Sequence, residues 1–244
     1  MNPIVKALIE REYAAQRSEE WLALRGNMLT ASDAATVLGL NPYEKVDDFI
    51  LKKCGHGTFH GNEATEHGNK YEDEARDMYC AQYNEVSHEI GIHPHPVYKW
   101  LGGSPDGITE SGKLIEIKCP LRRKITPEVP VYYMPQIQLL LEILGLEEAV
   151  FIQYKPYDLT WPAPMEFVVT EVKKEPDWFS KHFSTFESVW NRVLWHRENG
   201  VEDILPKPKP QRKSTPRKAK EFPDECIIEE DDLSESAFAS VCDV

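Results

Sequence analysis

The segment GGSPDGITESGKLIEIKCP, residues 102–120, places three residues that can do chemistry around a short hairpin. Asp106 lies in a glycine-rich turn, and Glu116 and Lys118 follow on the next strand. Residues two apart in a strand project from the same face, so Glu116 and Lys118 share one face. The opposite face then carries the apolar residues Ile115, Ile117 and Cys119.

Two carboxylates held a few ångströms apart repel each other unless a cation lies between them. With oxygen ligands only, that cation is a hard one, such as Mg²⁺ or Mn²⁺. Lys118 cannot ligate a metal while protonated, but it can orient a water or stabilise the charge of a transition state. The same three residues also fit an exposed Glu–Lys strand pair beside a turn aspartate, and taken alone they leave both interpretations open.

Three other segments accompany this hairpin in a fixed order: EEWLALRGNMLTASDAATVLGLNPY (19–43), HGNKYEDEARDMY (67–79) and YYMPQIQLLLEILGL (132–146). Together with SPDG and ExKCP, these motifs resemble the lambda-type exonuclease and YqaJ-like viral recombinase family of the PD-(D/E)XK nuclease superfamily. The resemblance covers about residues 18–172. It implies a restriction-endonuclease-like core and Mg²⁺-dependent hydrolysis of phosphodiester bonds, with Mn²⁺ as a substitute.

The resemblance also implies roles for individual residues. Asp106 and Glu116 match the central metal ligands, with the backbone carbonyl of Ile117 as a further ligand. Glu72, on a helix expected over 63–83, matches the family's first metal-binding glutamate. Lys118 would position or activate the attacking water.

The assignments of Glu72 and of a glutamine on a later helix need further comment. Glu72 could instead pair with Arg76 four residues later on the same helix. Gln138, on a helix expected over 131–144, matches the family position that helps to hold the nucleophilic water. Gln136 cannot share a helix face with Gln138, because residues two apart point in different directions.

The motif TASD (30–33) opens a short apolar helix, with Thr30 and Asp33 at capping-box spacing. A helix N-terminus favours an anion, and Arg25 could add a bidentate phosphate contact. In the lambda-type family the matching arginine and serine bind the terminal 5′-phosphate, which makes Arg25 and Ser32 candidates for this role. The alternative is an ordinary helix cap beside a surface arginine.

Charge and cysteine content limit the function classes only loosely. The net charge of −13 disfavours non-specific DNA binding, but a local basic groove can still attract DNA. Arg122, Arg123 and Lys124 follow the strand directly and are candidates for DNA-backbone contacts, or simply solvated charges. No apolar stretch approaches the ~20 residues of a membrane span. Five cysteines without a CxxC pair suit a reducing, intracellular compartment.

Apolar periodicity predicts an α/β (α+β) fold with a mixed central sheet flanked by helices. Residues 1–200 would form the PD-(D/E)XK domain. Residues 201–244 read as a disordered charged tail, basic over 207–220 and acidic over 221–244. The expected helices cover about 3–15, 32–38, 45–54, 63–83, 131–144 and 176–197, and the expected strands are SHEIGIHP, DGIT, KLIEIKC, AVFIQYKPY and MEFVVTEV.

The resulting hypothesis is a Mg²⁺-dependent exonuclease that digests linear double-stranded DNA from the 5′ end, leaving 3′ single strands for recombination or repair. By resemblance, its partners would be double-stranded DNA ends, other copies of itself in a trimer, and a single-strand-annealing protein, with no membrane. In a eukaryotic host the basic tail would favour the nucleus. The alternatives are an endonuclease or nickase with the same metal site, and a DNA-end-binding module without activity.

Overall fold

The computed structural model describes residues 1–57 and 63–206, and the chain divides into two units, Met1–Leu205 and Pro206–Val244. The basic and acidic segments expected over 207–244 lie outside the described residues. The first unit continues past residue 200, because Val201 is buried and Ile204 packs against the core. Among the described residues, no helix is both long and apolar enough to cross a membrane.

The larger of two sheets has the strand order β2-β5-β6-β7-β8 and carries the predicted catalytic strand, β6, at its centre. β6 and β7 are parallel and the other neighbours are antiparallel, so the sheet is mixed, as predicted. A parallel pair requires a crossover, and helix α6 (Met134–Leu144) provides it. The strands are β2 (Ser87–His88), β5 (Gly107–Thr109), β6 (Lys113–Lys118), β7 (Glu148–Lys155) and β8 (Glu166–Lys173).

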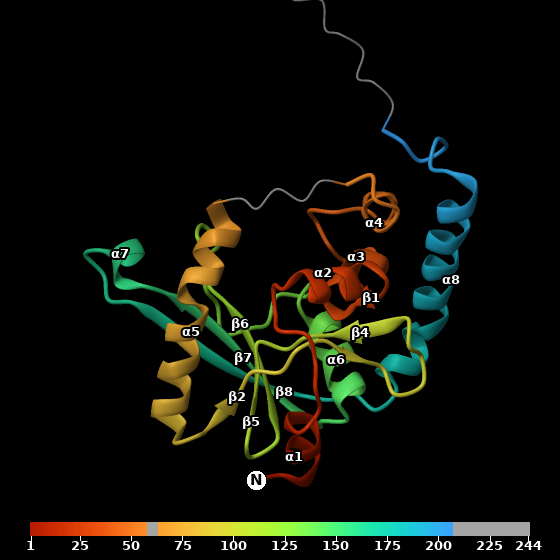
Figure 1. Cartoon of the computed structure of the whole chain (residues 1–244). Coiled ribbons are helices and arrows are strands. Elements are labelled where there is room, and N and C mark those ends of the chain that lie inside the picture. Colours follow the sequence, from red (N-terminus) through yellow and green to blue (C-terminus); the bar gives the residue numbers. More distant parts are fainter. Residues whose placement is uncertain (58–62, 207–244) are drawn as a thin grey trace, which may run out of the picture. The chain divides into compact units, whose positions relative to one another are not determined.

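Helices cover both faces of this sheet (Figure 1). On one face, Ala75 and Tyr79 of α5 (Glu63–Tyr83) pack with Ile115 and Ile117 of β6. On the other face, α6 belongs to a larger core that includes Leu114 of β6. The alternation predicted for β6 is therefore confirmed, since Ile115, Ile117 and Cys119 share the α5 side.

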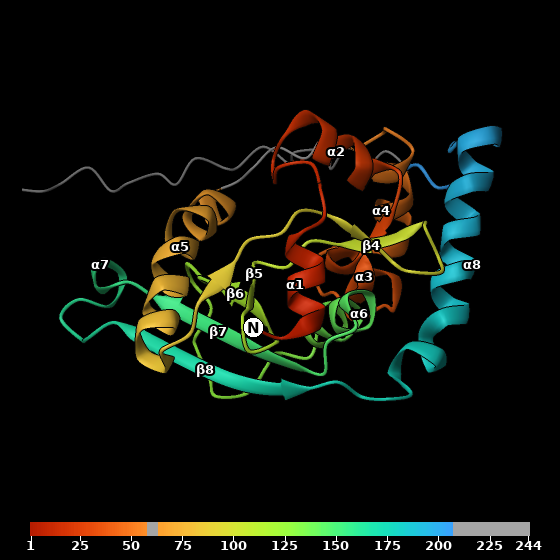
Figure 2. The same ribbon diagram turned by 60° about the horizontal axis from the view of Figure 1, so that its bottom comes forward.

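A smaller sheet, ordered β1-β4-β3, supports the helices of the N-terminal half. Helix α8 packs against α3, α4 and α6 at the side of this sheet (Figure 2). The remaining elements are α1 (Pro3–Ile9), α2 (Glu19–Gly26), β1 (Leu29–Thr30), the 3₁₀ turn η1 (Ala31–Asp33), α3 (Ala34–Val37), α4 (Val46–Lys53), β3 (His93–Pro94), β4 (Leu101–Gly103), α7 (Tyr157–Thr160) and α8 (Trp178–Asn199).

The sequence-based expectations were wrong mainly for short elements. The helix expected over 3–15 ends at Ile9, and α2 was not expected at all. The strand expected over 87–94 splits into β2 and β3, which belong to different sheets. Strands of two or three residues contain too few positions to show an alternating pattern, which is why β1 and β4 were also missed.

We predict that Gly91→Ala destabilises the protein, because a Cβ atom there would lie 2.5 Å from the backbone oxygen of Ala14 and 2.8 Å from the ring of Tyr13. Overpacking of this kind costs about 1–3 kcal/mol. Urea unfolding measures the loss. Gly26→Ala is the matched control, because a Cβ at Gly26 meets nothing within 4 Å. Equal midpoints for the two variants would contradict the prediction.

Candidate active site

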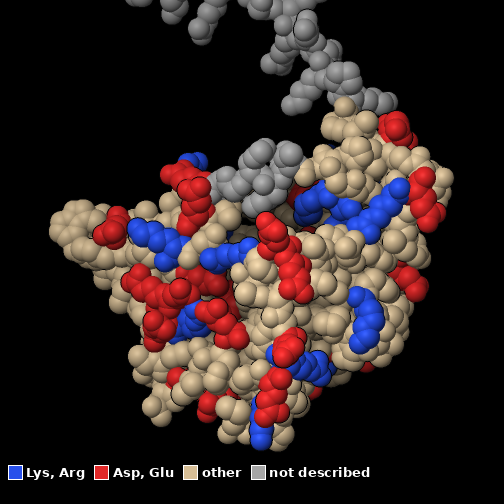
Figure 3. Space-filling view, in the orientation of Figure 1, with Lys and Arg blue, Asp and Glu red and all other residues tan. Residues whose placement is uncertain are grey.

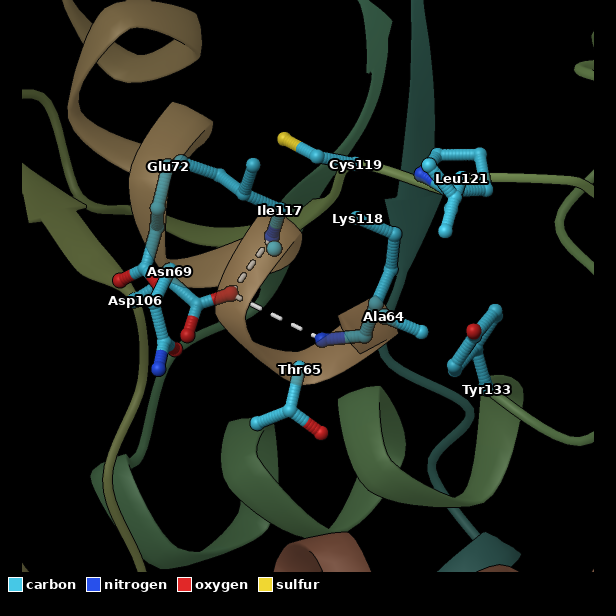
Figure 4. A pocket seen from close by; sticks show the side chains of 12 residues that line it. Ala64, Thr65, Asn69, Glu72, Asp106, Ile117, Lys118, Cys119, Leu121 and Tyr133 are labelled. Atoms are coloured by element: carbon cyan, nitrogen blue, oxygen red, sulfur yellow. Dashed lines mark hydrogen bonds and ion pairs between the residues drawn. The ribbon is translucent and has the colours of Figure 1, made fainter. Parts of the chain in front are cut away.

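The start of β5 and the C-terminal end of β6 bring Asp106 and Ile117 together. Asp106 precedes the first residue of β5, and its Oδ2 accepts a 2.7 Å hydrogen bond from the backbone N–H of Ile117 (Figure 4). The Asp106 carboxylate thus continues the hydrogen bonding between β5 and β6 one residue before β5 begins. The N–H and C=O of one strand residue point to the same neighbour, so the carbonyl of Ile117 faces the Asp106 side as well.

Arg76 anchors the turn that carries Asp106. Its Nη1 donates a 2.8 Å hydrogen bond to the backbone oxygen of Asp106, and its Nη2 pairs with Asp73 and Glu89. Arg76 therefore makes its ion pairs with these two acids and not with Glu72, the alternative that the helix spacing had left open. Glu72 forms an ion pair with Arg17, whose Nη2 lies 3.4 Å from Glu72 Oε2.

A pocket of about 380 Å³ opens where these elements meet. Glu72, Asp106, Ile117 and Lys118 all line it, so the structure brings four of the predicted site residues together (Figure 4). Glu116 is 0 % exposed and pairs with Lys118 Nζ, which also lies 3.9 Å from Asp106 Oδ2. The other lining residues are Ala64, Thr65, Gly68, Asn69, Cys119, Pro120, Leu121 and Tyr133.

Crowding of negative charge shifts the pKa values of this cluster. Burial, and then the nearby Asp106, raise the pKa of Glu72 to about 7. The same two causes raise the pKa of Glu116 to about 8. Burial opposes the charge of Lys118, but Glu116 and Asp106 outweigh it and raise the pKa of the lysine, which stays protonated. One ammonium group therefore has to neutralise several carboxylates.

The donor set fits a hard divalent cation. All of its members are oxygens, and Glu116 Oε2 is buried with no hydrogen-bond partner among the described residues. Glu72, Asp106, Glu116 and the Ile117 carbonyl would hold such an ion. Within residues 1–57 and 63–206, no three His, Cys, Asp or Glu side chains form a preformed metal-binding group. Lys118 Nζ contacts both Glu116 and Asp106 and supplies the compensating charge in this structure.

Arg25 and Ser32, the predicted phosphate pair, contact each other. Arg25 Nη2 donates a 2.9 Å hydrogen bond to Ser32 Oγ, and its guanidinium carbon lies 4.5 Å from the centroid of the Trp21 ring. Trp21 Nε1 in turn donates a 3.0 Å hydrogen bond to Ser104 Oγ. Ser104 lies two residues before Asp106, so a short chain of contacts links this pair to the carboxylate pocket.

The turn that carries Ser32 is fixed by a buried acid. Asp33 Oδ2 accepts hydrogen bonds from the backbone N–H of Thr30 at 3.0 Å and from its hydroxyl at 2.7 Å, which confirms the predicted capping box. Asp33 is buried, which opposes its charge, but Lys53 and Lys52 hold its pKa down to about 2. The ionised carboxylate keeps two cations close to the Arg25–Ser32 pair.

Gln138 lies apart from the pocket, contrary to expectation. Its side chain is 2 % exposed, with Nε2 donating to the Lys173 carbonyl and Oε1 accepting from the Glu175 N–H, both at 2.9 Å. Both amide atoms are therefore committed to the segment that follows β8. Gln136, three residues after Tyr133, is the glutamine on the Tyr133 face of α6.

The basic run after β6 separates into different environments. Arg122 is exposed and lies 3.6 Å from Glu63, and Lys124 is also exposed. Arg123 is half-buried, and its Nη1 donates a 2.8 Å hydrogen bond to Gln153 Oε1. Figure 3 shows that basic side chains gather near α4 and acidic ones over the middle of α5, so the face is strongly patterned despite the negative net charge.

Sequence reasoning missed Arg17 and Asn69. Arg17 adopts a positive φ of 69°, and its Nη2 lies 3.2 Å from Asn69 Oδ1 as well as beside Glu72. Asn69, three residues before Glu72 on α5, lines the pocket, and its helical spacing was a usable signal. Nothing in the spacing of Arg17 could have predicted its position, because its contacts come from a distant part of the chain.

We predict that Gln138→Ala lowers the free energy of unfolding by about 1–3 kcal/mol, because it removes both hydrogen bonds of the buried Gln138 amide, at about 0.5–1.5 kcal/mol each. Thermal unfolding of the metal-free protein measures the change. Gln136→Ala removes the same amide group from a half-buried position and should cost less. If both variants unfold at the same temperature, the structural role of Gln138 is wrong.

Comparison with known proteins places the chain in a family. Residues 20–147, just over half of the chain, match the YqaJ-like viral recombinase domain. The chain is 34 % identical over 159 residues to protein R354 of Acanthamoeba polyphaga mimivirus, covering 57 % of this chain and 29 % of the relative. It is 32 % identical over 154 residues to protein D345L of African swine fever virus, covering 50 % and 44 %. The chain thus spans less than half the length of these relatives.

Among solved structures, an alkaline exonuclease from Laribacter hongkongensis, LHK-Exo, matches with a TM-score of 0.62 and 24 % identity, covering 74 % of this chain and 95 % of the exonuclease. The same exonuclease in complex with dAMP matches with a TM-score of 0.62 and 25 % identity. The mixed sheet and its flanking helices are therefore those of the lambda-type alkaline exonuclease fold. The chain belongs to the YqaJ-like viral recombinase family.

Proposed function

We propose that this chain is a Mg²⁺-dependent DNA exonuclease that hydrolyses phosphodiester bonds of linear double-stranded DNA from the 5′ end. The observation that carries the proposal is the single pocket lined by Glu72, Asp106, Ile117 and Lys118, with Glu116 buried behind it. The family and the fold of the alkaline exonuclease support a nuclease. The cation, the substrate and the direction of digestion rest on the chemistry of the site and on resemblance.

A bound divalent cation would supply a hydroxide-like nucleophile and neutralise charge on the phosphoryl group. The residues around it would divide the remaining work. Asp106, fixed by the Ile117 N–H, and the buried Glu116 hold their oxygens in place without rearrangement. Lys118 stays protonated, so it is suited to orient the water and stabilise negative charge rather than to act as a general base.

Arg25 and Ser32 are the proposed reader of the terminal 5′-phosphate. The guanidinium is held by Trp21 and Ser32, so little side-chain freedom remains to be lost when a phosphate binds. Arg122, Arg123 and Lys124 are proposed to contact the DNA backbone. Assembly into a trimer, pairing with a single-strand-annealing protein, a role in recombination or repair, and a nuclear location in a eukaryotic host remain predictions from resemblance and from the tail.

The decisive test is digestion of linear duplex DNA in Mg²⁺ beside a closed circular duplex. We expect the linear DNA to be degraded and the circle to remain intact, and Lys118→Ala to reduce the rate by roughly 100-fold or more, as for the loss of other transition-state donors. Cutting of the circle would favour an endonuclease or nickase. If the protein binds DNA ends but does not cleave them in Mg²⁺ or Mn²⁺, it is a DNA-end-binding module without nuclease activity.

We predict that Arg25→Ala abolishes the preference for a phosphorylated end. The substrate carries a 5′-phosphate at one end and a 5′-hydroxyl at the other, and the ratio of strand loss from the two ends is measured. Loss of a charge-assisted contact of about 1.5–3 kcal/mol lowers that ratio at least about tenfold. Arg192→Ala on α8, an exposed arginine paired with Asp47, is the control. An unchanged ratio in Arg25→Ala would remove this pair from phosphate recognition.

We predict that Mg²⁺ affinity rises with pH between about 6 and 8. Glu72 and Glu116 hold protons up to pH values of about 7 and 8 in the metal-free protein, and Mg²⁺ has to displace them. Acidification therefore weakens binding, by up to about tenfold per pH unit for each proton released. Calorimetry in two buffers of different ionisation enthalpy counts the protons. Glu72→Gln should release fewer protons when it binds Mg²⁺. A Mg²⁺ affinity that does not change with pH would contradict this prediction.

A further inference from the structure

A second cavity, of about 460 Å³, adjoins the carboxylate pocket. The two share Ala64, Pro120, Leu121 and Tyr133 in their walls, so they are continuous along one side of Tyr133. The second cavity differs in chemistry because no predicted metal ligand lines it. Its wall instead combines aromatic and cationic side chains with one acid: Tyr43, Tyr132, Tyr133, Arg122, Arg123 and Glu63. We call this cavity the tyrosine groove.

Tyr43 lies on an anchored loop but leaves its ring in solvent. Its backbone N–H donates a 3.0 Å hydrogen bond to Asn41 Oδ1, and Asn41 Nδ2 donates a 2.8 Å hydrogen bond to Thr36. On the other side, Glu44 pairs with Lys52 at 2.8 Å. Tyr43 is nevertheless 82 % exposed. A tyrosine side chain has only two rotatable bonds, so on an anchored backbone it offers contact area at a small cost in conformational entropy.

The rings are arranged to receive a flat group. Tyr43 and Tyr132 meet edge to face at 6.1 Å and 84°, and Tyr132 lies 4.5 Å from Tyr133. Tyr133 also packs against Lys118, whose Nζ lies 5.5 Å from the ring centroid. The tyrosines therefore extend from the ammonium of the carboxylate pocket to an exposed ring face. An aromatic group bound on Tyr43 would be connected to that pocket by a continuous wall.

Arg122 of the groove is available to an anion. The Arg122 side chain is 86 % exposed, and its ion pair with Glu63 at 3.6 Å is of a kind that contributes little. Arg123 lies over the Tyr133 ring at 5.8 Å, and its Nη2 is buried with no hydrogen-bond partner among the described residues. Cations interleaved with exposed aromatic rings are the surface that binds single-stranded nucleic acid.

We propose that the tyrosine groove binds an unpaired nucleobase of the DNA strand whose phosphodiester lies at Lys118. The base stacks on the exposed ring of Tyr43, which Tyr132 supports edge to face, and Arg122 contacts the phosphate beside it. This inference rests on the proposed nuclease function and names the residues that hold one unpaired base of its substrate. Stacking is indifferent to base identity, so the groove tolerates any sequence.

The test compares Tyr43→Leu with Tyr43→Phe in the full chain. The probe is a 5′-phosphorylated single-stranded DNA octamer carrying 2-aminopurine, whose fluorescence falls on stacking, at the first, second or third nucleotide in turn. Ca²⁺ replaces Mg²⁺ to supply a hard cation. Abasic versions of the same octamers remove the base and keep the phosphates. Tyr157→Leu, which alters another exposed tyrosine on α7, is the matched control.

We expect the wild type, Tyr43→Phe and Tyr157→Leu to quench one of the three probes and to bind it equally well. Tyr43→Leu should lose the quenching and bind about fivefold to 150-fold more weakly. An abasic nucleotide at that position should weaken the wild type by a similar factor and leave Tyr43→Leu unaffected. Equal binding by wild type and Tyr43→Leu, or a wild-type complex without quenching, would contradict the proposal that the tyrosine groove binds a base.

Failure of the groove and failure of the nuclease are distinguishable. Cleavage of linear duplex DNA by the wild type in Mg²⁺ is measured in parallel. If the wild type cleaves DNA but Tyr43→Leu binds every probe as tightly as the wild type, the base-binding role of the tyrosine groove is wrong and the proposed nuclease function is retained. If the wild type neither cleaves DNA nor binds any octamer, the proposed function and this inference fall together.

Discussion

The Lys118 ammonium among buried carboxylates is the interaction on which the rest of the site depends. Glu116 is 0 % exposed, and an unpaired buried charge would cost several kcal/mol. Lys118 neutralises part of that charge, and the carboxylates in turn keep the lysine protonated. Burial, and after it the remaining excess of acid, raise the pKa values of Glu72 and Glu116. A cluster of this kind gains stability when a further cation binds.

The scaffold holds this cluster through backbone contacts more than through ion pairs. The Ile117 N–H fixes Asp106, Arg76 fixes the turn before β5, and Glu116 is buried on β6, which pairs in parallel with β7. The Trp21–Ser104 hydrogen bond then connects the turn to the Arg25 region. The Arg25 region and the carboxylate pocket come from distant parts of the sequence and are linked in space through the loop that carries Ser104 and Asp106.

The sequence predicted the parts of this arrangement that follow from local periodicity. The alternation in β6 separated Glu116 and Lys118 from Ile115, and capping-box spacing predicted the turn around Thr30 and Asp33. Local periodicity could not predict long-range contacts, such as the ion pair between Arg17 and Glu72. Gln138 was misplaced because a motif position does not say which way an amide points, and here the backbone after β8 engages it.

The central claim is that Glu72, Asp106, Glu116 and the Ile117 carbonyl bind a hard divalent cation. Anomalous X-ray scattering from crystals of the protein grown in Mn²⁺ tests it most directly, since the ion identifies its own ligands. We expect one or two Mn²⁺ ions ligated by Glu72, Asp106, Glu116 and the carbonyl of Ile117, with Lys118 displaced from at least one carboxylate. Mn²⁺ bound only elsewhere, with the contact between Lys118 and Glu116 unchanged, would contradict it.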